Sequence, residues 1–224
     1  QESWLELLGD RVPVPPPSRN GRAFLRLAWA ALAEERNLPL TAHPIPTSLR
    51  RLSVLQEPFP EAIAVQVAPD LHTWTKQGLF EVVSPATPEN SARLRFSSGA
   101  TRAFATAALE QPAEAHKLAA VAWARTPESD EAIRERTIHL LRAGAAKPAD
   151  IHAVIQLEVT RERPLHIRRW LDMLWLHLSP HEAKTAKNTF EIRYAQLYHQ
   201  LYVSPGTIQV ADVRELAVQA DSAY

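Results

Sequence analysis

The pattern of hydrophobic and polar positions changes its period in the first half of the chain. Asp70–Gln77 has helical spacing. It lies between Pro69, which favours a helix start, and Gly78, which can adopt the left-handed conformation that ends a helix. Leu79–Val83 is rich in β-branched and aromatic residues, and Arg93–Phe96 alternates polar with apolar residues, as in a half-buried strand. This pattern predicts a helix followed by two short strands.

Polar segments connect these elements to their neighbours. Ser84–Ser91 contains two prolines and an asparagine, which favour a turn. Ser97 or Ser98 is placed to cap a helix that continues through Ala103–Glu110. Three further helical segments are expected upstream, with Thr47 capping the second of them: Arg22–Asn37, Ser48–Leu55 and Glu61–Val67.

Beyond Pro112 the periodicity is helical almost throughout. Breaks that contain proline or glycine separate five expected helices: Glu114–Arg125, Ser129–Ala143, Pro148–Glu162, Leu165–Leu178 and Pro180–Tyr202. Short connections of this kind favour antiparallel packing, as in a bundle. Thr207–Val210 is expected to form one strand, and Val213–Ala220 a last short helix.

Composition limits the classes of function. The 224 residues are 46% hydrophobic, enough for one large or two small domains, and no apolar run reaches the length of about 18 residues that predicts a membrane helix. The absence of cysteine excludes disulfides and thiolate metal sites, and is compatible with the cytoplasm. Six glycines form no phosphate-binding or nucleophile motif, so we expect neither an enzyme nor a cofactor. Pro180 separates His177 from His181, and we expect no metal site.

The formal net charge is zero, so any contact with nucleic acid must come from a local excess of positive charge. From Arg93 to Arg102 three arginines occur without an acidic residue among them, which favours contact with phosphate. Glu158 and Glu162 lie one helical turn apart and are expected on a solvated, salt-bridged face.

The order of helix, strand, polar tip, strand and helix resembles a winged helix-turn-helix. GLFEVV and RLRFSSGATRAF are similar to the wing of MarR-type repressors. LHTWTKQGLF followed by NSARLRFS is similar to the recognition helix and wing of MerR-type proteins. The resemblance covers residues 45–105. Two helix pairs fit it: Ser48–Leu55 with Glu61–Gln77, or Glu61–Gln66 with Asp70–Gln77.

The resemblance implies binding to double-stranded DNA as a transcriptional regulator, and we expect the protein in the cytoplasm. The residues expected to contact DNA lie on the recognition helix or the wing: His72, Thr73, Thr75, Lys76, Arg93 and Arg95. Leu71 and Trp74 are expected to face the core of the domain. The alternative is a helical adaptor that binds only protein.

The expected fold class is mainly α. A segment with a proline-rich linker occupies 1–20, a winged helix-turn-helix domain with a small β-ribbon occupies 21–110, and an all-α bundle for oligomerisation occupies 111–224. Four aromatic residues recur at every fourth position of the last long helix and form one ridge: Phe190, Tyr194, Tyr198 and Tyr202. Such a ridge suits either a core or an interface, and we expect it to form a homodimer contact.

Overall fold

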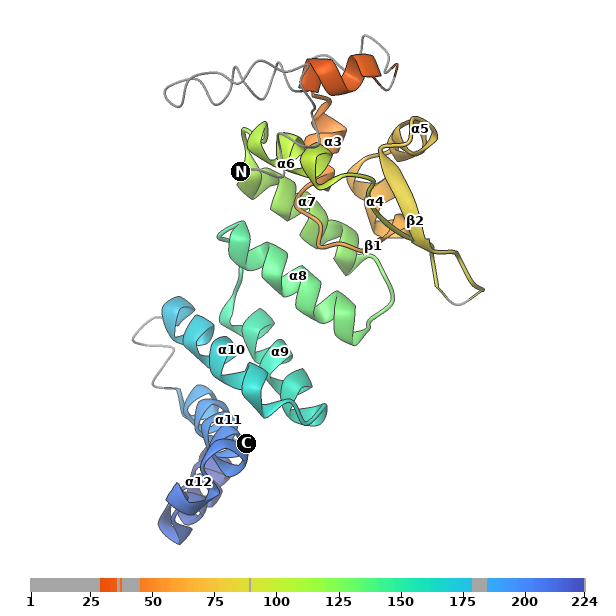
Figure 1. The fold of residues 1–224 in the computed structure, drawn as a ribbon. Coiled ribbons are helices and arrows are strands. Elements are labelled where there is room, and N and C mark those ends of the chain that lie inside the picture. The colour runs from red at the N-terminus through yellow and green to blue at the C-terminus, as the bar shows by residue number, and fades with distance from the viewer. Residues whose placement is uncertain (1–28, 36, 38–44, 89, 179–184, 224) are drawn as a thin grey trace. The chain divides into compact units, whose positions relative to one another are not determined.

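The protein is described by a computed structural model for residues 29–35, 37, 45–88, 90–178 and 185–223 (Figure 1). It is mainly helical with one small antiparallel sheet, which confirms the expected class. The chain divides into two compact units, Gln1–Thr126 and Pro127–Tyr224. The segment with a proline-rich linker expected at 1–20 lies outside the described residues, as do the starts of the helices expected from Arg22 and from Pro180.

The first unit contains a helix at 29–35, with Trp29 buried, and then a mixed series of helices and strands. In order these are α3 (Thr47–Leu52), β1 (Phe59–Pro60), α4 (Glu61–Val67), α5 (Leu71–Lys76), β2 (Phe80–Ser84), β3 (Arg93–Phe96), α6 (Gly99–Ala107) and α7 (Pro112–Ala124). The strands form one sheet in the order β1-β3-β2. Strand β1 was not predicted, because two prolines read as chain breaks. Pro60 fits there because β1 is an edge strand, where a missing backbone donor is tolerated.

The sheet buries one of its faces. Phe80 of β2 pairs with Phe96 of β3, and Phe59 of β1 pairs with Leu94 of β3. The rings of Phe59, Phe80 and Phe96 lie with centroids 4.5–6.4 Å apart. These four side chains are almost fully buried, so the expected alternation in β3 is confirmed.

Local signals end or start the helices of this unit. Gly78 has φ +70, so it takes the left-handed position expected after α5. The hydroxyl of Ser98 accepts hydrogen bonds from the N–H groups of Ala100 and Thr101, which makes it the N-cap of α6. The expected cap by Thr47 is wrong, because Pro46 holds the N-cap position of α3 and the Thr47 hydroxyl accepts from Arg50 instead.

Helix α7 belongs to the first unit. It packs against α3 and α4, and its buried face includes Ala115, Ala119 and Trp123. The division between the units therefore falls after Thr126, whereas the sequence pattern predicts a helical body that begins at 111.

The second unit is a succession of helices, each packed against the next: α8 (Asp130–Arg142), α9 (Pro148–Thr160), α10 (Pro164–His177), α11 (Ala186–Val203), the 3-10 turn η4 (Pro205–Thr207) and α12 (Val210–Ala223). The expected strand Thr207–Val210 is wrong. Residues 207–210 lie instead at the end of η4 and the start of α12, because Pro205 begins a helical turn and the Asp212 carboxylate accepts the N–H of Gln209.

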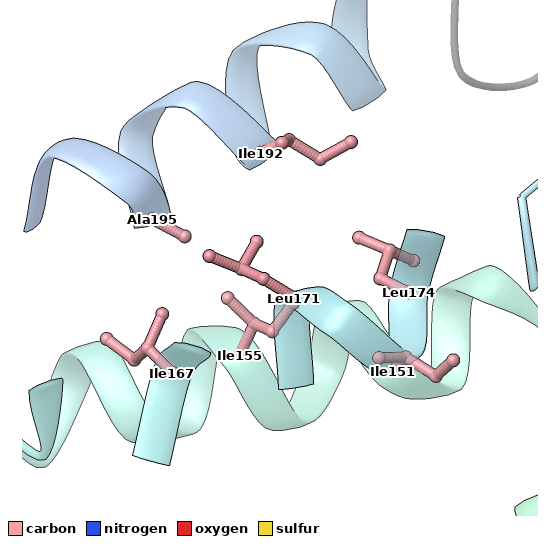
Figure 2. Packing of buried hydrophobic residues seen from close by; sticks show 7 residues of the cluster. All are labelled: Ile151, Ile155, Ile167, Leu171, Leu174, Ile192 and Ala195. Atoms are coloured by element: carbon pink, nitrogen blue, oxygen red, sulfur yellow. The ribbon is translucent and has the colours of Figure 1, made fainter. Parts of the chain in front are cut away.

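Apolar side chains from three helices form the core of the second unit (Figure 2). They are Ile151 and Ile155 of α9, Ile167, Leu171 and Leu174 of α10, and Ile192 and Ala195 of α11. The steps of three or four residues between them place each set on one side of its helix. No described helix has the length and apolar character needed to cross a membrane.

Candidate nucleic-acid interface

Helices α4 and α5 follow one another in the chain across a short turn. Glu61–Val67 and Leu71–Lys76 are separate helices, because Ala68 is extended with φ −142 and ψ 91. Residues 61–77 are therefore not one helix. Of the two helix pairs left open by the sequence, Glu61–Gln66 with Asp70–Gln77 fits the observed helices to within one residue at each end.

A hydrogen-bonded network fixes the inner face of α5. Leu71 and Trp74 are buried, as expected. The indole Nε1 of Trp74 donates to Asp70 Oδ2 at 2.9 Å and lies 3.1 Å from Ser48 Oγ. Ser48 Oγ in turn donates to Asp70 Oδ2 at 2.8 Å. Because Ser48 belongs to α3, this network sets how α5 lies against α3 and so which side chains of α5 face outward.

The outward face of α5 carries three of the predicted contact residues. His72, Thr73 and Lys76 are exposed, and Lys76 forms no ion pair with any described residue. His72 Nδ1 lies 3.6 Å from Glu61 Oε1 of α4. Thr75 is half-buried, and its hydroxyl donates to the carbonyl of Leu71 at 3.1 Å, so it is the least available of the four.

The arginines of the hairpin have partners. Arg95 of β3 is exposed and pairs with Glu81 of β2, the residue opposite it in the ladder. Arg93 is half-buried, and its Nη1 donates to the carbonyl of Pro58 at 3.1 Å. Arg102 of α6 lies 3.4 Å from the carboxylate of Glu57. The sequence places no acidic residue among these arginines, but the folded chain brings two carboxylates to them. Strand pairing brings Glu81 to Arg95, and folding of the chain brings Glu57 to Arg102.

The pairing of Arg95 leaves it available for exchange. The Arg95 side chain is 56% exposed and that of Glu81 is 44% exposed. Exposed ion pairs of this kind contribute little free energy, typically below about 1 kcal/mol. A phosphate oxygen can therefore replace Glu81 as the partner of Arg95 at low cost.

A hollow of about 220 Å³ lies beside α3 and was not predicted. Its polar lining is mixed in sign and includes Arg50, Arg51, Glu110 and Glu114. Arg50 is 21% exposed and donates to the carbonyl of Ala108 at 3.3 Å as well as to Thr47. These bonds tie α3 to the end of α6, which makes Arg50 a structural residue.

The aromatic ridge on α11 is neither wholly core nor wholly surface. Ring centroids along it lie 6.1, 6.5 and 5.2 Å apart from Phe190 to Tyr202. Tyr194 and Tyr202 are 41% and 51% exposed, whereas Phe190 is half-buried and Tyr198 packs against the core cluster. The ridge therefore offers two exposed aromatic side chains supported by two partly buried ones.

Glu158 of α9 is buried in the second unit. The expected solvated face is wrong for it: its side chain is fully buried, with Arg134 Nε at 2.5 Å and His166 Nδ1 at 3.2 Å. Such partners offset the free-energy cost of burying a carboxylate. Among the described residues, His, Asp and Glu side chains nowhere gather in groups of three or more suited to a metal ion.

Comparisons of the chain with protein-family models, with curated proteins and with solved structures return no match.

Proposed function

We propose that the first unit binds double-stranded DNA as a winged helix-turn-helix, with α4 and α5 as the helix pair and the β2–β3 hairpin as the wing. The observation that most supports this is topological. The helix pair lies between β1 and β2 in sequence, the hairpin follows α5 directly, and the strands are ordered β1-β3-β2. This is the succession of recognition helix and wing that the resemblance implies.

In this proposal α5 enters the major groove. His72, Thr73 and Lys76 are polar, exposed and long enough to reach base edges or phosphates, and the Trp74 network holds the helix that carries them. Arg95 and Arg93 on the wing contact phosphate or the minor groove. The protein then acts by binding rather than by catalysis, and we place this regulator in the cytoplasm.

Two lysines of the first unit provide a matched test. Lys76→Ala removes an exposed ammonium group, paired with no described residue, from the proposed groove-binding helix, whereas Lys117→Ala removes one that pairs with Glu114 on α7. Fluorescence anisotropy with a labelled mixed-sequence duplex should show weaker binding for Lys76→Ala and unchanged binding for Lys117→Ala. Equal affinities for both variants and the unmodified chain would remove α5 from the interface.

Self-association is the second part of the proposal. A single head buries little DNA surface, and two-fold dimers reading two half-sites overcome this limit. The exposed aromatic side chains of the α11 ridge support such a contact. Tyr194→Arg should lower the mass measured by light scattering with helix content unchanged. Trp175→Arg, at an exposed aromatic position on α10, is the control and should leave the mass unchanged.

A protein-binding adaptor is the second candidate. It is favoured by the pairing of Arg95 and Arg102 with carboxylates, which reduces the free positive charge of the first unit. Exposed valines on the hairpin, Val82 and Val83, would then serve as a protein contact. An unmodified chain that shows no salt-dependent affinity for duplex DNA would favour this candidate.

A further inference from the structure

Helix α12 has one side that packs and one side that does not. Its inner side lies against α11, where Arg193 forms an ion pair with Asp212. No residue of α12 is buried, and Val210 and Val213 are 69% and 55% exposed. A helix of 14 residues usually derives its stability from burying an apolar face, so this exposed side lacks a partner within the described chain.

The exposed side has an ordered pattern. Val210, Val213 and Ala217 follow one another at steps of three and four residues, which places them on one stripe. Arg214 and Asp221 lie along the edge of the same stripe, seven residues apart, and both are exposed. Within the described residues, neither side chain forms a hydrogen bond or an ion pair with another, although both other acidic residues of α12 are bonded, Asp212 to Arg193 and Glu215 to Gln219.

The geometry points to a second copy of this chain as the partner of this stripe: we propose that two α12 helices pair antiparallel about a two-fold axis that passes between Ala217 and Val218. Arg214 and Asp221 lie at equal distances on either side of that point, about 5 Å along the helix axis at about 1.5 Å per residue. The axis therefore brings each Arg214 level with Asp221 of the partner copy, and the two side chains form an ion pair at each of two identical contacts.

Charge selects this arrangement over a parallel one. Parallel pairing in register would place Arg214 opposite a second Arg214 and Asp221 opposite a second Asp221, and both contacts are repulsive. At the centre the small side chain of Ala217 lies level with exposed Val218 of the partner copy, which allows the two helix backbones to approach closely, and Val213 lies level with Ser222. A closed two-fold contact of this kind needs no other protein, because one patch serves both copies.

This inference rests on the proposed self-association and adds α12 to its contact surface, and charge reversal tests α12 separately from the aromatic ridge. Arg214→Asp or Asp221→Arg alone places like charges together at both symmetric contacts, and should raise the dimer dissociation constant about tenfold or more. The double variant Arg214→Asp with Asp221→Arg restores opposite charges and should return the constant to that of the unmodified chain.

Sedimentation equilibrium of the full chain at low ionic strength measures these constants, since salt screens exposed charges. Glu215→Arg is the control, because Glu215 lies off the stripe and the charge change equals that of Asp221→Arg. A monomeric unmodified chain would overturn the proposal, as would single variants that dimerise as the unmodified chain does, or a double variant that stays as weak as the single ones. If the single reversals are silent while Tyr194→Arg dissociates the dimer, the ridge is the contact and α12 is not.

Discussion

Replacing Trp74 tests whether α5 is held against α3 in the way the candidate interface requires. The side chain is 4% exposed, and its indole N–H is bonded to Asp70 at 2.9 Å. Trp74→Ala removes a large buried ring and leaves a cavity, which costs about 3–5 kcal/mol of unfolding free energy. Trp74→Phe keeps most of the ring but loses the hydrogen bond to a carboxylate, so we expect a smaller loss of about 1.5–3 kcal/mol.

Hydrogen exchange followed peptide by peptide along a urea series is the suitable assay, because it reports the two units of the chain separately. Peptides of the first unit should lose protection at lower urea in Trp74→Ala, while those of the second unit keep their midpoint. Trp175→Ala is the matched control, since Trp175 is 49% exposed on α10 and should cost about 1 kcal/mol or less. A loss of unfolding free energy for Trp74→Ala no greater than for this control would show that Trp74 does not hold α5 against α3.

Two further predictions concern the second unit. Glu158→Gln breaks a buried ion pair and should cost on the order of 3 kcal/mol in urea unfolding, whereas exposed Glu162→Gln should cost little. The hydrogen bond from the Tyr198 hydroxyl to Tyr202 raises the pKa of Tyr198 from 10.0 to about 12. The unfolded chain therefore releases this proton at lower pH, and this contribution to stability falls as pH rises from 10 to 12. Tyrosinate absorbance should show Tyr198 ionising last, and Tyr202→Phe should abolish this delay. Ionisation of Tyr198 near pH 10 in the unmodified chain would contradict the prediction.

Much of the fold follows from local signals in the sequence. Proline and glycine breaks place α8, α9 and α10 within two residues of their observed bounds, and Gly78 and Ser98 act as the sequence predicts. The inward positions of Leu71 and Trp74 follow from helical periodicity. These features depend on residues close together in the chain, and so the sequence reveals them.

The features missed by the sequence depend on partners far along the chain. Glu81 becomes the partner of Arg95 only through the register of β2 and β3. The sequence from Arg93 to Arg102 contains no acidic residue, so it does not predict this ion pair. Glu158 is buried because Arg134, on another helix, supplies its counter-charge. Strand β1 exists because Phe59 pairs with Leu94, although its two residues carry little strand signal of their own.

The most direct test of DNA binding by the first unit is the salt dependence of duplex affinity, compared between the unmodified chain and the double variant Arg93→Ala with Arg95→Ala. Each phosphate neutralised by the protein contributes roughly 0.9 to the slope of log affinity against log salt concentration. We predict a steep slope for the unmodified chain and a slope shallower by roughly 0.9 for each arginine that no longer binds phosphate in the variant, with circular dichroism unchanged. A slope near zero for the unmodified chain would contradict DNA binding, and equal slopes for both proteins would exclude the wing from the interface.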